Sequence, residues 1–364
     1  MSTKIIAFYL PQFHPVSEND IWYGEGFTEW TNVAKAKKLF FGHYQPHVPA
    51  NLGFYDLRVK ENQLKQIELA KQYGIDVFCY WHYWFGNGKR LLQMPFDNVV
   101  NDQNLNFPFC LAWANHSWEK KLWNNQKNNQ TIMKQEYFGP EDYQKHFYEL
   151  LNAFQDKRYF RVDEKIFFVI YAPLDNLEIV EFIRIWRELA KKENLNDFYF
   201  VGKTFDSKDK EKILNLGFDA IYNDTTLLIH TKLPKPLKVY QLLKRKILRK
   251  PTVFKYKNAI KYMNTQDNKS GNTIPVVAPN WDHSPRSGNN SLILHDSKPK
   301  YFEKILDDVF HTIQSKDEKD KIIIIKSWNE WGEGNHLEPD LRFGTKYLDV
   351  VLKVKKKYDG DVNE

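Results

Sequence analysis

Residues 321–327 read KIIIIKS, and the chain continues directly into WNEWGEG at 328–334. An apolar run without alternating polar positions is typical of a strand that is covered on both faces, as in a parallel sheet. Seven earlier runs have the same character, at 4–10, 75–81, 107–113, 165–171, 198–204, 218–223 and 274–278. The sequence therefore predicts eight buried strands.

Segments with helical spacing of apolar residues separate these runs. We expect helices at 58–73, 140–154, 176–192, 208–216, 300–313 and 345–357. Eight strands alternating with helices predict an α/β protein with a single (β/α)8 TIM barrel. A doubly wound parallel sheet is the alternative, although residues 6–14 (IAFYLPQFH) lack the glycine-rich first turn that is usual in that fold.

Two connections are long, at 11–56 after the first strand and at 224–273 after the sixth. Loops of this length are usually functional or contain elements of their own. The chain has no internal repeat and no low-complexity linker. We therefore expect one barrel domain over 1–364, with an insert at about 225–273.

The positive charge is concentrated in that insert. The chain of 364 residues has a formal net charge of +7, and residues 231–262 contain eleven Lys and Arg but no acid. The rest of the chain, with 42 basic and 46 acidic residues, is mildly acidic. An acidic body opposes nucleic-acid binding, so we expect no nucleic-acid partner.

Within the insert, residues 239–249 (VYQLLKRKILR) form an amphipathic pattern with a cationic face. One interpretation is peripheral contact of 231–262 with an anionic membrane or with a diphosphate lipid carrier. The other is a helix that packs on the barrel and turns its charged face to solvent. The pattern leaves both open.

Membrane-spanning and secretory features are not expected. No run approaches the ~18 apolar residues that a membrane span needs, and the apolar stretch near the N-terminus is too short for a signal peptide. Cys79 and Cys110 fall inside apolar runs, where free buried thiols are the ordinary expectation. We expect a cytoplasmic protein, or one bound peripherally to the inner face of the plasma membrane.

Aromatic and hydrogen-bonding residues gather where the predicted strands end, which is where TIM barrels place their chemistry. Aromatic residues make up 16% of the chain. A sugar ring packs its C–H face on aromatic rings and bonds its hydroxyls to polar side chains, so this mixture suits a carbohydrate. The candidate substrate-binding residues at strand ends are Tyr9, Gln12, His14, Tyr80, His82, Trp84, Trp113, Asn115, Trp118, Tyr171, Tyr222, Asp224, Trp281, Asp282, Trp328, Asn329 and Trp331.

Glu330 and Glu333 are the candidate catalytic residues. An apolar surround and a like-charged neighbour both raise a carboxyl pKa, which lets one group act as an acid while the other stays ionised. Cleavage of a glycosidic bond needs such a pair. The alternative is a solvated pair at a helix start, but the position after a buried strand favours function. His43 and His47 lie in a loop without a ligand-bearing helix, so no metal and no cofactor are expected.

Several motifs together resemble the WbsX family of predicted polysaccharide-biosynthesis glycosyltransferases. They are IAFYLPQFHP, GFTEWTNV, GHYQPHVPANLGFYDLR, YGIDVFCYWHYWF, WDHSPR and SWNEWGEGNHLEPD, and they span about residues 4–348. That family is in turn similar to glycoside hydrolase family 99, whose endo-α-mannosidases are (β/α)8 barrels. The matching motifs add Glu29, Trp30, His47 and His336 to the candidate substrate-binding residues.

The resemblance to family 99 implies roles for both acids. Glu330 would be the base that takes the proton of the 2-hydroxyl, and Glu333 the general acid and then base, with net retention. Gly332 stands where family 99 has His, and residues 115–118 read NHSW where WbsX relatives usually carry NENW. These departures bear on the substrate more than on the reaction.

Three functions remain open at this point. The first is a retaining glycosidase or transglycosylase acting on bacterial surface polysaccharide, such as O-antigen or capsule, or on its lipid-linked precursor. The second is a nucleotide-sugar-dependent glycosyltransferase, which the family description favours although no nucleotide-binding fingerprint is visible. The third is a non-catalytic glycan-binding protein, against which the presence of both glutamates argues.

Overall fold

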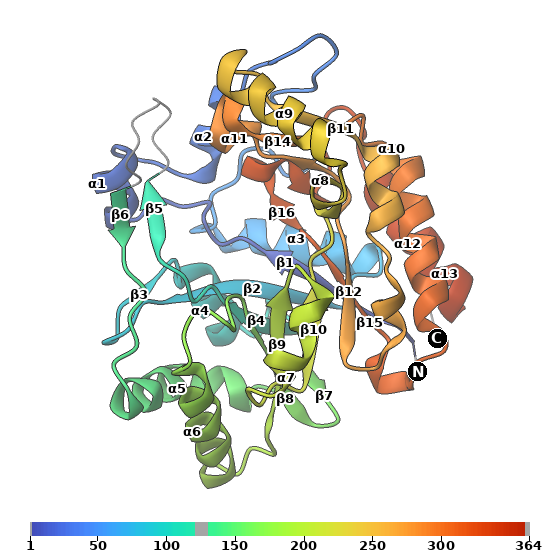
Figure 1. Ribbon diagram of the computed structural model, residues 1–364. Helices are drawn as coiled ribbons and strands as arrows, with labels where there is room; N and C mark the ends of the chain where they lie inside the picture. The colour runs from blue at the N-terminus through green and yellow to red at the C-terminus, as the bar shows by residue number, and fades with distance from the viewer. Residues whose placement is uncertain (1, 121–129, 361–364) are drawn as a thin grey trace.

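The computed structural model describes residues 2–120 and 130–360, and its centre is a closed ring of parallel strands (Figure 1). The ring order is β1-β15-β12-β10-β9-β8-β4-β2, and β2 pairs with β1 to close it. The ring strands are β1 (Lys4–Tyr9), β2 (Val77–Trp84), β4 (Phe109–Trp113), β8 (Lys165–Ile170), β9 (Phe198–Thr204), β10 (Ala220–Asn223), β12 (Thr273–Val277) and β15 (Ile322–Ile325). The predicted (β/α)8 barrel is confirmed.

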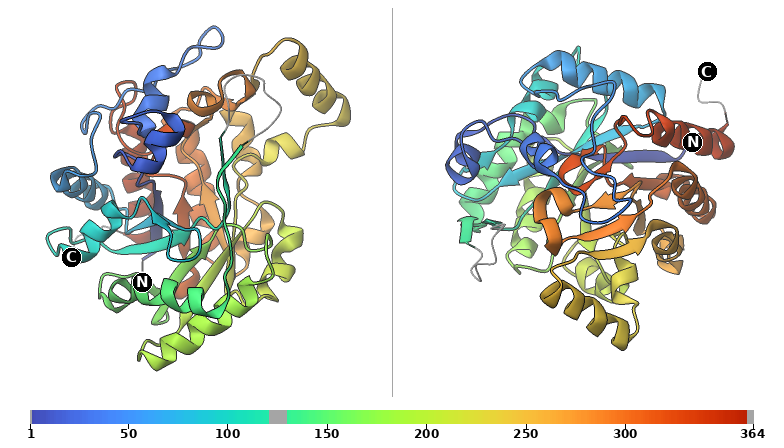
Figure 2. Two further views of the ribbon diagram at one scale, coloured as in Figure 1. Left: turned by 90° about the vertical axis from the view of Figure 1, so that its left-hand side faces the viewer. Right: turned by 90° about the horizontal axis from the view of Figure 1, so that it is seen from above.

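Helices cover the outside of the ring, as both views of Figure 2 show. Except for the helix at Met94–Asn101, which was not predicted, they bury apolar stripes that the sequence predicts; α6, for example, packs Phe182 and Trp186 inward. The helices that alternate with the ring strands are α3 (Lys60–Gln72), α4 (Met94–Asn101), α5 (Pro140–Gln155), α6 (Ile179–Lys192), α7 (Lys210–Leu214), α12 (Pro299–Ile313) and α13 (Lys346–Asp359).

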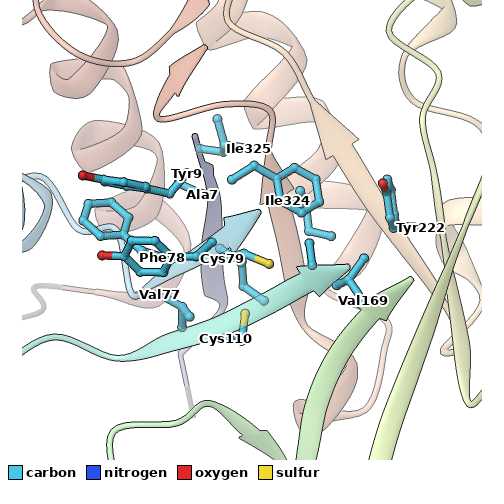
Figure 3. Close-up of a cluster of buried hydrophobic side chains, with 14 of the residues drawn as sticks. Ala7, Tyr9, Val77, Phe78, Cys79, Cys110, Val169, Tyr222, Ile324 and Ile325 are labelled. Carbon is cyan, nitrogen blue, oxygen red and sulfur yellow. The ribbon is translucent and has the colours of Figure 1, made fainter. Parts of the chain in front are cut away.

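The barrel interior is densely apolar. Ile323, Ile324 and Ile325 of β15 are fully buried, because the ring covers one face of the strand and helices cover the other. Figure 3 shows Ile324 and Ile325 in one buried cluster with residues of β1, β2 and β4. Cys79 and Cys110 are both buried free thiols in this region. This core fixes the strand ends, and therefore the site above them.

The connections at the carboxyl ends of the strands carry further elements. After β1 lie α1 (Ser17–Tyr23) and α2 (Glu29–Lys35), and after β10 lie α8 (Leu228–Thr231), α9 (Lys235–Ile247), β11 (Thr252–Lys255) and α10 (Tyr256–Ala259). The sequence analysis predicted these two elaborations and missed others. These are β3 (Arg90–Leu91), the β5 (Trp118–Lys120) and β6 (Gln130–Met133) pair, β13 (Trp281–Asp282), α11 (Ser284–Ser287), β14 (Leu292–His295), β16 (Asn329–Glu330) and β17 (Asn335–His336). At the opposite end, the short strand β7 (Arg161–Val162), which pairs with the start of β8, was also not predicted.

The insert is tied to the barrel through β11, which pairs with β14. Its helix α9 lies at the same end of the molecule as α2 and α11, and it stands away from the ring strands (Figures 1 and 2). In the described part of the chain, no helix combines the length and the apolar character that crossing a bilayer requires.

Candidate active site

Two adjoining cavities open where the ring strands end. The strand-end cavity, of about 350 Å³, lies directly above β1, β2, β9, β10 and β15, and the loop cavity, of about 550 Å³, is lined by the connections after β1 and β4. Cavities of this size suit small-molecule ligands. The residues that line both are Gln12, His116, Trp118, Tyr171, Arg286 and Glu333.

Glu330 and Glu333 reach this cleft from a tight loop that begins four residues after β15. The strand β16 pairs with β17, and a single 3-10 turn at Trp331–Glu333 joins them. Asn329 fixes the start of the loop, because its side chain accepts a hydrogen bond from the Leu10 amide (2.7 Å) and donates one to the Leu10 carbonyl (3.0 Å). Trp331 donates from its indole N–H to Glu338 Oε2 at 2.6 Å. The loop is therefore held from below while both carboxyl groups face the cleft.

Arg286 of α11 links three carboxylates. Its Nη2 donates to Glu330 Oε1 at 2.5 Å, and its Nη1 donates to Glu333 Oε1 at 2.9 Å. Its Nε donates to Glu29 Oε2 at 2.8 Å. We call this group the acidic corner: Glu29, Glu330 and Glu333 around Arg286. One guanidinium cannot neutralise three carboxylates, so the group retains a tendency to hold protons.

The pKa of Glu330 expresses that tendency. The pKa of Glu330 is raised to about 7: burial is the largest cause, Arg286 opposes the rise, and the charges of Glu333 and Glu29 add to it. A carboxyl group with a pKa near 7 exchanges its proton readily at neutral pH, which suits a general base or acid.

Gly332 allows the acidic corner to form. A Cβ at this position would lie 2.0 Å from Glu29 Oε2 and 2.9 Å from Arg286 Nε. The space next to the turn is therefore filled by Glu29 and Arg286.

A second charged group lies in the strand-end cavity. Lys326 Nζ is 2.9 Å from Asp224 Oδ2, and Lys203 Nζ is 3.6 Å from the same oxygen. The lysines come from the ends of β15 and β9, and Asp224 directly follows β10. We call Lys203 and Lys326 around Asp224 the basic corner.

Among the described residues, His47, His336 and Asp340 form a buried group whose ligand atoms lie within 4.8 Å of one another, so they have the composition of a metal site. Three of the four ring nitrogens already have partners: His47 Nδ1 is 2.9 Å from His336 Nε2, and His336 Nδ1 donates to the Glu338 carbonyl at 2.9 Å. His336 also stacks on Trp331, with ring centroids 3.7 Å apart. The group supports the loop that carries Glu330.

The family model described as glycosyltransferase WbsX matches residues 5–351. The chain belongs to the WbsX family. It is 33% identical over 353 residues to an uncharacterized protein, WxcX, of Xanthomonas campestris pv. campestris (strain B100). That match covers 96% of this chain and 49% of the relative, so the WbsX-family chain spans about half the length of the curated relative.

Solved structures share the fold at low sequence identity. A glycoside hydrolase-like protein superposes with a TM-score of 0.61 at 14% identity, covering 97% of this chain and 94% of that one. The GH99 endo-alpha-mannosidase from Bacteroides thetaiotaomicron gives a TM-score of 0.56 at 17% identity, covering 98% of this chain and 97% of that one. At such identities the likeness establishes the barrel fold of this WbsX-family chain.

The structure brings eight of the predicted site residues of this WbsX-family chain to the cleft. They are Gln12, Glu29, Trp118, Tyr171, Asp224, Trp281, Glu330 and Glu333.

The remaining predicted residues are buried or half-buried and line neither cavity of the cleft; two of them, His47 and Asp282, line a separate cavity. They are Tyr9, His14, Trp30, His47, Tyr80, His82, Trp84, Trp113, Asn115, Tyr222, Asp282, Trp328, Asn329, Trp331 and His336. The alternation of side chains along a strand explains part of this difference. On β2, His82 and Trp84 point outward to His146 of α5, whereas Trp81 and Tyr83 line the cleft.

Sequence reasoning missed several cleft residues. Arg286 belongs to the WDHSPR motif, and Lys203 and Lys326 stand at the ends of predicted strands, so each carried a positional signal. Phe205 and His116 also line the strand-end cavity of this WbsX-family chain.

Proposed function

We propose that this protein cleaves or transfers glycosidic bonds of a bacterial surface polysaccharide or its lipid-linked precursor, with Glu330 and Glu333 as the reacting pair. The observation that carries the proposal is the acidic corner, in which one guanidinium binds both carboxyl groups at the wall of a cleft. Paired carboxyl groups facing a common substrate space are what glycoside chemistry requires. The WbsX family description and the GH99 fold neighbour both concern carbohydrate-active enzymes.

The two cavities support different roles for the two acids. Glu330 lines the strand-end cavity, whereas Glu333 lines both cavities and so stands at their junction. A sugar in the strand-end cavity would present its 2-hydroxyl to Glu330, and the scissile bond would cross the junction beside Glu333. Glu330 would then take the 2-hydroxyl proton while O2 forms a bond to C1 and the bond from C1 to the leaving oxygen breaks, giving a 1,2-anhydro sugar that water or an acceptor hydroxyl opens, as the resemblance to family 99 implies. Glu333 would protonate the leaving oxygen.

Aromatic side chains supply surfaces for the sugar rings. Trp81, Trp118, Tyr171 and Trp281 line the strand-end cavity together with Gln12. Rings of this kind pack against the C–H faces of pyranoses, while amides and charged groups bond the hydroxyls. The lining therefore supports a carbohydrate ligand in the same space as the carboxyl pair.

The second candidate function is a nucleotide-sugar-dependent glycosyltransferase, which the family description favours. Incubation with defined α-linked oligosaccharides, with and without nucleotide sugars, separates the two. We expect product without a nucleotide, and its loss in Glu333→Gln. The control Glu188→Gln makes the same chemical change on the exposed side of α6 and should keep full turnover. Strict dependence on a nucleotide donor would overturn the glycosidase assignment, and binding without turnover under any condition would leave a lectin-like role.

We further propose that α9 docks the protein on an anionic membrane surface. Its apolar side chains are not packed on the barrel: Val239, Tyr240 and Ile247 are 55%, 58% and 71% exposed. Exposed apolar residues on a basic helix suit the interface of an anionic leaflet. The helix follows Leu227, which lines the strand-end cavity, so a lipid-linked substrate bound at the membrane would lie near the cleft.

Liposome co-sedimentation tests this docking. Vesicles containing phosphatidylglycerol should retain the protein, and pure phosphatidylcholine vesicles should not. The double variant Val239→Ser/Ile247→Ser should lose retention, whereas Val180→Ser, at an exposed apolar position on α6, should keep it. Equal recovery with both vesicle types would contradict membrane docking.

A further inference from the structure

The basic corner holds more positive than negative charge. Both ammonium groups face a single oxygen, Asp224 Oδ2, at 2.9 Å for Lys326 and 3.6 Å for Lys203. The side chains of Lys203 and Asp224 are each only 3% exposed, so water does little to offset the second ammonium. A buried surplus charge is costly unless a counter-charge accompanies it. The charge of Glu333 favours protonation of both lysines, but its Oε1 accepts a hydrogen bond from Arg286, so a ligand carboxylate would supply a counter-ion in direct contact with the ammonium groups.

Aromatic rings surround the two ammonium groups. Lys203 Nζ lies 3.6 Å from the centroid of the Tyr171 ring and 4.2 Å from that of Phe205. Lys326 Nζ lies 4.4 Å from the centroid of the Trp281 ring. Such contacts stabilise a cation, but the rings are neutral and leave the net charge unchanged. The rings therefore hold the two ammonium groups at the aromatic wall of the strand-end cavity, against which a sugar ring would stack.

We infer that the basic corner binds the carboxylate of an acidic sugar, such as a uronic acid, in the strand-end cavity next to Glu330. The inference rests on the proposed function for the identity of the ligand as a sugar. A carboxylate carries one negative charge, which matches the one surplus positive charge, and ammonium–carboxylate hydrogen bonds are among the stronger polar contacts. A diphosphate would bring more negative charge than the corner can compensate.

Because Lys203 can lose its proton, binding of an acidic sugar at the basic corner should depend on pH. Burial lowers the pKa of Lys203 to about 7; Lys326 lowers it too, while Asp224 and Glu333 act in the opposite direction. The ring of Tyr171 also faces this ammonium. A bound anion stabilises the protonated form, so binding takes up a proton when Lys203 is neutral. Affinity for an acidic sugar should therefore fall between pH 6 and pH 8.

A matched pair of probes tests the inference by NMR titration: α-methyl glucuronide and α-methyl glucoside, which differ by the carboxylate alone. We expect the glucuronide to bind about tenfold more tightly at pH 6, as one charge-assisted contact allows. Lys203→Met should remove the preference, and the exposed control Lys212→Met should retain it. Asp224→Asn should reduce the preference at pH 6, because Asp224 raises the pKa of Lys203 and its loss favours the neutral amine; the preference should return at lower pH, a shift that a purely structural ion pair would not produce.

Equal affinity for the two probes in the wild-type protein would overturn the inference, as would tighter binding of methyl phosphate than of the glucuronide through Lys203. If Lys203→Met fails to fold, the Asp224→Asn comparison decides the question in the same way. Binding is read without turnover, so a glucuronide preference stands even if no bond is cleaved. Cleavage of neutral oligosaccharides without that preference would overturn the inference and leave the proposed function intact.

Discussion

The two charged corners of the cleft have opposite compositions of charged groups. In the acidic corner, one guanidinium is shared by three carboxyl groups; in the basic corner, one carboxylate is shared by two ammonium groups. The acidic corner therefore has more negative than positive groups, and the basic corner has more positive than negative groups. In the acidic corner, the raised pKa of Glu330 suits that carboxyl group to proton transfer. In the basic corner, the surplus positive charge suits the binding of an anionic ligand. We therefore assign the reaction to the acidic corner and recognition of the ligand to the basic corner.

The largest expected effect comes from breaking the acidic corner at Glu333. Glu333→Gln keeps the shape and removes the transferable proton, so we expect turnover to fall by about 10²–10⁴-fold, the usual contribution of a general acid. Lys326→Met in the basic corner should raise KM instead, with a smaller change in kcat. Steady-state kinetics of both variants would separate the corners; an equal loss of kcat in both would contradict their different roles.

The next effect concerns the space that the acidic corner occupies. A methyl group at Gly332 would lie 2.0 Å from Glu29 Oε2, so Gly332→Ala should lower the free energy of unfolding by about 1–3 kcal/mol, as overpacking does. Chemical denaturation measures this change. In a Glu29→Ala background the closest clash is absent, so the same substitution should be less costly; purely additive effects would contradict the contact.

A smaller effect is expected in the pH dependence. If Glu330 acts as the base, it must be ionised, so kcat/KM should rise as pH increases through about 7. Glu29 raises the pKa of Glu330, so Glu29→Gln should move the rising limb of the pH profile of kcat/KM to lower pH. Asp224→Asn, in the other corner, should leave the limb in place. A limb that stays fixed in Glu29→Gln would argue against Glu330 as the titrating group.

The smallest effect is expected at Tyr171, whose ring faces Lys203 at 3.6 Å. A cation–π contact of this kind contributes about 0.5–2 kcal/mol, so Tyr171→Leu should weaken binding of α-methyl glucuronide by several-fold. Tyr171→Phe keeps the ring and should bind nearly as well as the wild-type protein. Similar losses in the two variants would assign the effect to the phenolic hydroxyl instead.

The strands were predictable because a strand that is buried on both faces consists of consecutive apolar residues, as in the four consecutive isoleucines of β15. The direction of a side chain at a strand end was not predictable. His82 and Tyr83 are adjacent in the sequence, yet His82 points outward to a helix and Tyr83 lines the cleft. Arg286 escaped prediction because its role depends on a loop placing it against carboxyl groups 44 and 47 residues further along. Spacing along the chain carries no signal for such a contact.

The central claim is that Glu330 and Glu333 act as a pair through the sugar's own 2-hydroxyl. The most direct test is the anomeric configuration of the first product, followed by ¹H NMR during cleavage of an α-linked oligosaccharide by the wild-type protein. The account predicts that the α-anomer appears first and then mutarotates, and that Glu333→Gln forms product about 10²–10⁴-fold more slowly. Initial release of the β-anomer would contradict it.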